Sequence, residues 1–307
     1  MQNRRRKFLQ QCINTSLALS LLLKNAFSAN PNLHKKRKIP KYEEKIPIIG
    51  LGTYRTFDVG LQSQSMKMLE TVVKKFINSG GRVIDTSPMY GNSETVIGSL
   101  TEKLQAENSL FHATKVWTNG KDQGINQIAA SFKLMRVKTV DLLQIHNLVD
   151  WQTHITTLQT LKEEKKIRYM GITHYHRGAY NELERILKLK LFDFVQFNLS
   201  PIETEAEARL LPIAQETGHA VIVNRPFVGG QIFRKTAGIP LPSWAKDFDC
   251  NSWAQFCLKY ILSHGGVTCV IPGTGKLNHL IDNIGASHGR LPDKSTRKKM
   301  KEFIATL

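Results

Sequence analysis

Four ionisable side chains stand at or just after the ends of three successive apolar runs in the sequence. Asp85 ends the first run and Tyr90 follows it by five residues, while Lys115 and His146 end the next two runs. Each residue alone has a structural explanation, such as packing at a rim or solvation at a strand end. An acid, a phenol, an ammonium and an imidazole brought together form a set suited to proton transfer, because neighbouring charges shift the pKa of each member.

The apolar runs around these residues predict the elements that position them. Eight short runs are almost continuously apolar, which is typical of strands buried on both faces. These runs are 46–51, 82–85, 111–115, 141–146, 169–173, 193–197, 220–224 and 268–271. Segments of helical period lie between or after them, at 65–78, 93–106, 125–135, 152–164, 180–187, 205–216, 253–263, 278–286 and 294–305.

Eight strands, each followed by a helix, predict an α/β fold whose parallel sheet closes into a single-domain (β/α)8 TIM barrel. An open dinucleotide-binding sheet is the alternative, but no G-x-G-x-x-G follows the first strand. In a barrel the carboxyl ends of all strands meet on one face. We therefore expect Asp85, Tyr90, Lys115 and His146 to converge there.

Two segments fall outside this repeat. Residues 29–45 form a polar lead-in to the barrel, which is predicted over 46–307. Residues 226–249 form a long connection that contains three prolines and the pair Gly229-Gly230. Connections of this length in compact domains usually have a functional role, for example as binding loops, so we expect one here.

Composition restricts the class of protein. The chain has 307 residues, of which 41% are hydrophobic and 22% charged, and these values exclude disordered and fibrous proteins. The formal net charge is +18. Much of it lies in runs at 35–41 and 297–301 with no aromatic residue interleaved to stack on bases, so no nucleic-acid partner is expected.

Residues 1–28 have the layout of an export signal: a basic start, a modest apolar stretch at 13–23 and then small residues. Arg5-Arg6 followed by Phe8-Leu9 resembles a twin-arginine signal, the address of proteins exported after folding. An ordinary signal peptide, an uncleaved anchor and an amphipathic tail stay open as alternatives. We expect the mature chain to meet the export machinery, to reach the periplasm and not to insert stably in the membrane.

The mature chain would contain three cysteines, Cys250, Cys257 and Cys269, since Cys12 lies in the leader. An odd number argues against a closed set of disulfides and predicts buried free thiols.

Over almost its whole mature length the chain resembles the aldo-keto reductase family. The segments that carry the resemblance are "IPIIGLGTY", "VIDTSPMYGNSE", "ATKVW", "DLLQIHN", "GITHYH", "VQFNLSP", "RPFVGG" and "VIPGTGKLNHLIDNIGA". The most specific element is Asp85-x4-Tyr90-Gly91 with the spaced Lys115 and His146, which match the family's catalytic tetrad. The resemblance implies a carbonyl reductase that depends on NAD(P)H, on the barrel fold expected above.

In such a reaction hydride passes from a nicotinamide to a carbonyl carbon, and the carbonyl oxygen receives a proton. The resemblance makes Tyr90 the proton donor. A free phenol, with a pKa of about 10, is a poor acid at neutral pH. Lys115 is therefore expected to lower the pKa of Tyr90, Asp85 to keep Lys115 charged, and His146 to orient the carbonyl and stabilise its negative charge.

The resemblance also implies a cofactor site, in which Thr173 and Gln196 contact the nicotinamide amide and the region 273–283 holds the adenosine 2′-phosphate at a helix N-terminus. NADP(H) is favoured and NAD(H) stays open. The implied cofactor residues are Gly52, Thr53, Thr173, His174, Gln196, Gly273, Thr274, Lys276, Asn278 and Asn283. The sequence departs from the family at His174, where asparagine is common, at Asn224-Arg225, where an aromatic stacker is usual, and at Gly273 and His279, where lysine and arginine are usual.

Three aromatic residues, Tyr54, Trp117 and Trp151, follow strand ends and are predicted to line an apolar substrate pocket. No metal is expected. Two rival functions remain. A cofactor-occupied binding or regulatory module would show little turnover, although an intact tetrad argues against it. A basic protein that binds nucleic acid or an envelope polymer would carry its charge in a stripe.

Overall fold

The computed structural model describes residues 35–307. The predicted export signal at 1–28 and the first part of the lead-in lie outside the described residues. Within 35–307, none of the helices combines the length and the apolar character needed to cross a bilayer.

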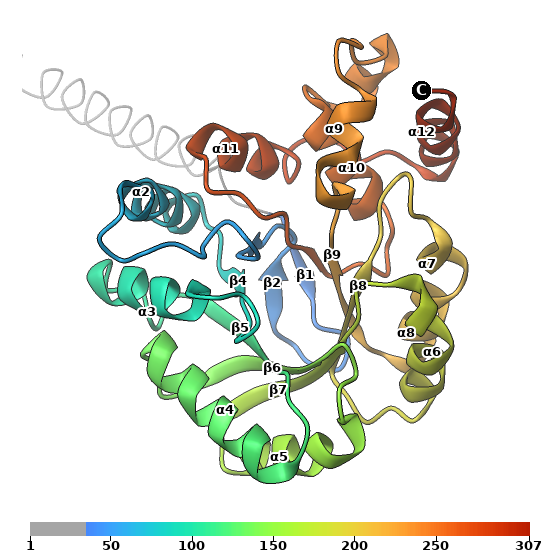
Figure 1. Ribbon diagram of the computed structural model, residues 1–307. Helices are drawn as coiled ribbons and strands as arrows, with labels where there is room; N and C mark the ends of the chain where they lie inside the picture. The colour runs from blue at the N-terminus through green and yellow to red at the C-terminus, as the bar shows by residue number, and fades with distance from the viewer. Residues whose placement is uncertain (1–34) are drawn as a thin grey trace, which may run out of the picture. The chain divides into compact units, whose positions relative to one another are not determined.

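Eight parallel strands form one curled sheet (Figure 1). In their order across the sheet they are β3 (Leu51–Gly52), β4 (Val83–Asp85), β5 (Phe111–Val116), β6 (Val140–His146), β7 (Ile167–Thr173), β8 (Phe194–Asn198), β9 (Ala220–Asn224) and β10 (Cys269–Val270). Isolated parallel bridges between Ile49 and Val270 and between Gly52 and Gly273 connect the segments around β3 and β10. A Cβ atom on Gly52 would lie 2.8 Å from the Ile271 carbonyl oxygen, so this close approach requires glycine.

Helices alternate with the strands and lie outside the sheet (Figure 1). They are α2 (Gln64–Asn78), α3 (Ser93–Lys103), α4 (Lys121–Met135), α5 (Trp151–Glu163), α6 (Tyr180–Lys188), α7 (Glu205–Ala208), α8 (Leu210–Thr217), α9 (Gln231–Lys235), α10 (Trp253–Leu262), α11 (Leu277–Gly285) and α12 (Lys294–Thr306). This alternation of eight parallel strands with helices is the arrangement that the sequence predicts.

The helix predicted over 205–216 is instead two helices, α7 and α8. The ring of Pro212 removes a backbone N–H and crowds the carbonyl four residues earlier, which belongs to Ala208. The first helix ends at that residue. The break is therefore a local effect of the proline.

The predicted first strand at 46–51 is wrong in extent. Its start forms β2 (Lys45–Pro47), which pairs antiparallel with β1 (Lys36–Lys38), and only Leu51–Gly52 joins the parallel sheet as β3. Ile39 and Ile46 of this hairpin belong to the same buried cluster as Phe111 and Phe194. Those two residues begin β5 and β8, so the hairpin packs against the amino ends of the strands.

The described cysteines, Cys250, Cys257 and Cys269, are buried free thiols, which confirms that expectation.

Candidate active site

The carboxyl ends of neighbouring strands bring a buried ion pair together. Lys115 Nζ donates hydrogen bonds to Asp85 Oδ1 at 2.7 Å and to the Thr86 carbonyl oxygen at 2.6 Å. The side chains of Lys115 and Asp85 are 0% and 2% exposed. Gln144 Nε2 donates to the other carboxylate oxygen at 3.2 Å. A charge buried this deeply requires such partners, so the pair is held in one geometry.

Tyr90 lies against this pair. It follows β4 in a turn in which its backbone N–H donates to the Ser87 carbonyl at 2.9 Å. The Lys115 ammonium lies 4.8 Å from the centre of the Tyr90 ring, and the His146 ring meets Tyr90 edge-on with 5.7 Å between centroids. The structure therefore gathers all four residues that the sequence singles out.

The pKa of Tyr90 differs from the expectation. Burial raises it, the nearby Lys115 ammonium lowers it and the Asp85 carboxylate raises it, and the balance lies above the ordinary value. The predicted lowering by Lys115 is present, but burial outweighs it. For Lys115, burial favours the neutral amine, but Asp85 and Tyr90 outweigh it and raise the pKa. The site thus holds a charged lysine beside a protonated phenol.

His146 is held as a neutral imidazole. Its Nδ1 lies 3.0 Å from Ser87 Oγ, and only 5% of the residue is exposed. Burial, together with Lys115 and His174, lowers the pKa of His146 to about 2. Ser87 is a site residue that sequence reasoning missed. Its position between Asp85 and Tyr90 is a signal, but its contact with a residue 59 positions away needs the fold.

Several predicted cofactor residues lie at the ends of the next strands. Thr173 and Gln196 are paired in register on β7 and β8, and both are buried. Within the described chain, Gln196 Oε1 is a buried atom without a hydrogen-bond partner, and so is Asn224 Oδ1 at the end of β9. Unpartnered polar atoms at this face fit the amide of a bound nicotinamide, since buried polar groups are normally satisfied.

His174 lies just beyond β7 and is half-buried. Its Nδ1 accepts a hydrogen bond from the His176 backbone N–H at 3.1 Å, and its ring stacks on Tyr175. Burial and the neighbouring His176 lower the pKa of His174.

The remaining predicted cofactor residues divide into buried and exposed ones. Thr53 is fully buried and donates to the Asp85 carbonyl at 3.0 Å, so its hydroxyl supports the backbone of the tetrad. Thr274 is buried and accepts from the Lys276 backbone N–H at 3.1 Å, at the start of α11. The side chains of Lys276 and Asn278 are exposed, whereas Asn283 is buried on the same helix.

Two of the three predicted pocket aromatics lie beside the tetrad. The Tyr54 ring is 5.0 Å from that of Tyr90 and the Trp117 ring is 6.3 Å from that of His146, and both side chains are partly exposed. Trp151 lies elsewhere. Its indole N–H donates to Glu182 of α6 at 3.2 Å, because Trp151 begins α5 and faces the neighbouring helix. It is not among the residues gathered around Tyr90.

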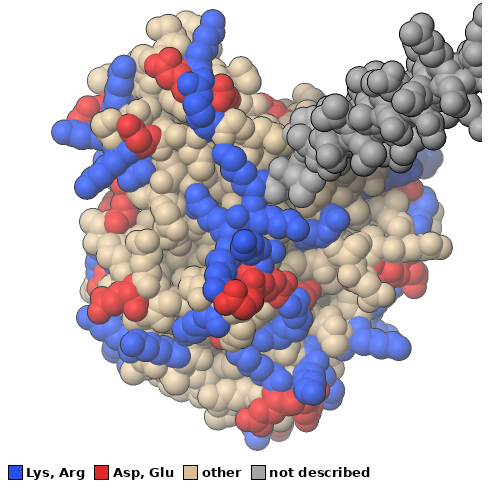
Figure 2. Space-filling model, turned by 180° about the vertical axis from the view of Figure 1, so that it is seen from behind, with Lys and Arg blue, Asp and Glu red and all other residues tan. Residues whose placement is uncertain are grey.

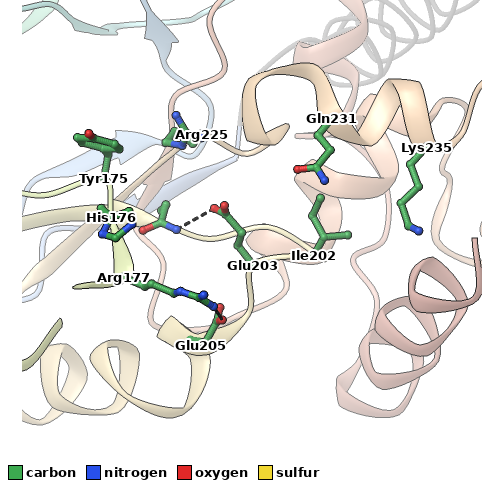
Figure 3. Close-up of a pocket in the computed structure, with 10 residues that line it drawn as sticks. Tyr175, His176, Arg177, Ile202, Glu203, Glu205, Arg225, Gln231 and Lys235 are labelled. Atoms are coloured by element: carbon green, nitrogen blue, oxygen red, sulfur yellow. Dashed lines mark hydrogen bonds and ion pairs between the residues drawn. The ribbon is translucent and has the colours of Figure 1, made fainter. Parts of the chain in front are cut away.

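A cavity of about 490 Å³ lies beside the carboxyl ends of β7, β8 and β9 (Figure 3). In a parallel sheet these ends share one edge with the strand ends that carry the tetrad. Tyr175 and Arg225 line it, with the guanidinium 5.7 Å from the centre of the Tyr175 ring. Since Tyr175 also stacks on His174, contacts run from the predicted nicotinamide position into this cavity. In the sequence, Arg225 stands out only as a departure from the family pattern, and no motif marks Tyr175 as a site residue.

The aldo/keto reductase family model matches residues 48–303, a span that includes every strand of the parallel sheet. The chain belongs to the aldo/keto reductase family. Among described residues, the match covers the whole tetrad and the strands that position it.

Named reductases are similar to this chain over most of its length. Glyoxal reductase of Bacillus subtilis is 28% identical over 247 residues, which cover 78% of this chain and 82% of the relative. The 9,11-endoperoxide prostaglandin H2 reductase of Trypanosoma cruzi is 26% identical over 264 residues, which cover 83% of this chain and 87% of the relative. The structure of an aldo/keto reductase from Klebsiella pneumoniae, solved with NADP and acetate, superimposes with a TM-score of 0.74 at 20% identity, over 89% of this chain and 96% of that one.

Proposed function

We propose that this aldo/keto reductase reduces an aldehyde or a ketone to an alcohol, with NADPH preferred over NADH and Tyr90 as the proton donor. The observation that best supports this proposal is the buried Lys115–Asp85 ion pair directly beside the Tyr90 ring. A reduced nicotinamide, when bound, supplies the hydride. The fold proposed for this reaction is a closed, single-domain (β/α)8 barrel.

Each tetrad residue has a distinct part in moving the proton. The Tyr90 hydroxyl gives its proton to the carbonyl oxygen as negative charge develops there. Lys115 stabilises the phenolate that remains, and Asp85 holds Lys115 charged and in place. His146 is neutral and donates a hydrogen bond to the same carbonyl oxygen, which orients the substrate.

Preference for the phosphorylated cofactor is supported by Lys276. Its side chain is exposed at the start of α11, where backbone N–H groups and the helix dipole favour an anion. The Klebsiella pneumoniae neighbour was solved with NADP. Residues that would hold the nicotinamide end are Thr173, Gln196 and Asn224, on the evidence of the two unpartnered amide oxygens.

The test is NADPH oxidation by the purified full chain against a panel of aldehydes and ketones, with NADH in parallel. The proposal expects steady turnover of at least one carbonyl compound and a higher kcat/KM with NADPH. Tight NADPH binding without turnover of any compound would instead support the regulatory module. No binding of either nucleotide would contradict the proposal.

We also propose that the chain is exported to the periplasm after folding, through a twin-arginine signal at 1–28. The support is the sequence alone, since these residues lie outside the described part of the chain.

A further inference from the structure

Basic side chains gather on the face opposite the tetrad. Figure 2, which views the molecule from behind, shows Lys and Arg gathered across the middle of this face, with a smaller group of Asp and Glu among them. Six lysines from three elements at the amino ends of the strands define what we term the basic face. They are Lys36, Lys41 and Lys45 of the hairpin, Lys165 in the turn before β7, and Lys188 and Lys190 before β8.

These six lysines form no ion pairs within the described residues. In residues 35–307, none of the six lies within ion-pair distance of a carboxylate. Four neighbouring acids are engaged with other cations: Glu43 with Lys38, Glu44 with Arg168, Glu164 with Lys166, and Asp193 with Lys162. Glu163, two residues before Lys165, is exposed and has no ion pair within residues 35–307, so it offsets one of the six lysines. The basic face therefore keeps an excess of positive charge that the fold itself does not neutralise.

Several of these charges lie close together. Burial lowers the pKa of Lys41, and among its charged neighbours Asp193 raises it while Lys162 and Lys190 lower it further. Lys41 donates to the Phe192 carbonyl at 3.0 Å, which fixes the hairpin beside the turn that follows α6. Lys188 ends α6 and Lys190 lies in that turn. The two elements thus present one continuous surface.

Apolar side chains alternate with lysines in that turn. Leu189 and Leu191 are 45% and 41% exposed, and Lys188 and Lys190 precede them in the sequence Lys-Leu-Lys-Leu. A helix end explains Lys188 by itself, because cations are favourable at helix C-termini. It does not explain the hairpin lysines or the two exposed leucines.

We propose that the basic face docks on the surface of an anionic lipid bilayer. The lysines would meet lipid phosphates while Leu189 and Leu191 enter the interface between headgroups and acyl chains. The large exposed aromatic side chains among the described residues, Tyr54, Trp117, Tyr175 and Phe233, lie on other elements. Tyr42 of the hairpin is half-buried, with its ring against Tyr169 and its hydroxyl bound to Asp193, so the basic face offers no exposed ring to stack on nucleic-acid bases. In this orientation the tetrad faces away from the bilayer. The inference is independent of the proposed function.

The test is sedimentation of the full chain with vesicles of phosphatidylglycerol and phosphatidylcholine, compared with vesicles of phosphatidylcholine alone. A lysine near an anionic surface contributes about fivefold to the partition coefficient. The double variant Lys188→Glu with Lys190→Glu is expected to bind anionic vesicles at least about 25-fold more weakly. Added salt should weaken binding of the unaltered chain.

The matched control is Lys67→Glu with Lys121→Glu, which makes the same change in net charge in the first turns of α2 and α4. Both lysines are exposed and lack an ion pair within the described residues. The control should bind almost as well as the unaltered chain. All these chains share residues 1–34, so differences between them report on residues 35–307.

A second variant, Leu189→Ser with Leu191→Ser, should weaken binding that persists at high salt. Equal losses in the lysine variant and its control would overturn the proposal, because net charge alone would then explain binding. Equal binding to vesicles without anionic lipid would also overturn it. So would tight binding of duplex DNA that depends on Lys188 and Lys190 while the leucine variant binds lipid normally, since the partner would then be a nucleic acid.

Discussion

Ser87 Oγ lies 3.0 Å from His146 Nδ1, and this contact determines which ring nitrogen carries the proton. The same hydroxyl oxygen accepts a hydrogen bond from the Met89 backbone N–H at 3.2 Å. A hydroxyl has one proton and two lone pairs, and no other acceptor for the Ser87 proton lies within hydrogen-bond distance among the described residues. We therefore infer that this proton points at Nδ1, which acts as the acceptor. A neutral His146 then carries its proton on Nε2, the nitrogen left to donate to a substrate oxygen.

Ser87→Ala should lower kcat by about tenfold, the effect of about one hydrogen bond, because His146 loses the contact that fixes its tautomer. Ser87→Thr keeps the hydroxyl and should keep most activity. Nitrogen-15 NMR of the His146 ring supplies the decisive readout: unaltered protein should show protonated Nε2, and Ser87→Ala a mixture of tautomers. A protonated Nδ1 in the unaltered protein would refute this role.

The pH dependence follows from two shifted groups. The pKa of Tyr90 is raised above its ordinary value, so the phenol stays protonated and able to donate through the neutral range. Oxidation of an alcohol needs the opposite form, a phenolate that accepts a proton, and its rate should climb continuously from about pH 6 to about pH 10. His146, with a pKa of about 2, adds no titration near neutrality. Rates of alcohol oxidation across this range check the sign, and a plateau beginning near neutral pH would contradict it.

Lys276→Ala should raise the Kd for NADPH by about tenfold and leave that for NADH nearly unchanged, since only NADPH carries the 2′-phosphate that this ammonium would meet. Fluorescence titration of each nucleotide provides the measurement. Lys294→Ala, at the exposed start of α12, is the control and should change neither Kd. Equal weakening for both cofactors by Lys276→Ala would remove this residue from the phosphate site.

Arg5→Lys combined with Arg6→Lys should trap an active, uncleaved enzyme in the cytoplasm. The unaltered chain should appear in the periplasm, cleaved near Ser28 or Ala29. A chain threaded unfolded would have to find its nucleotide outside, whereas export after folding carries the cofactor along. Immunoblots and NADPH-linked activity on each fraction report the outcome. Arg4→Lys with Lys7→Arg is the matched control, and undiminished export of the Arg5 and Arg6 variant would defeat the twin-arginine interpretation.

Much of the sheet could be predicted because strands buried on both faces are continuous apolar runs, as in β6 and β7. The run at 46–51 predicted too long a strand of the parallel sheet. Its first half is apolar because Ile46, in the hairpin, packs against the amino ends of the sheet strands. An apolar run shows that a segment is buried, but not which partner strand its backbone meets.

The tetrad could be predicted from spacing, since strand ends converge in this fold. The direction in which the pKa of Tyr90 shifts could not be predicted, because it depends on how far the effect of burial outweighs that of Lys115. The contact of Trp151 with Glu182 could not be predicted either, because the side chain of the first residue of α5 takes its direction from the helix. Nor could the sequence show that lysines far apart along the chain share one face.

The central claim is that Tyr90 donates the proton in carbonyl reduction, and Tyr90→Phe tests it most directly because it removes the hydroxyl and almost no contact area. Single-turnover reduction of an aldehyde by the variant, preloaded with NADPH, should be at least about 100-fold slower, in line with the loss of a general acid. The Kd for NADPH should stay within about twofold of the unaltered value, because the ring remains in place beside Lys115 and His146. Reduction at the unaltered rate, with NADPH bound, would contradict the account.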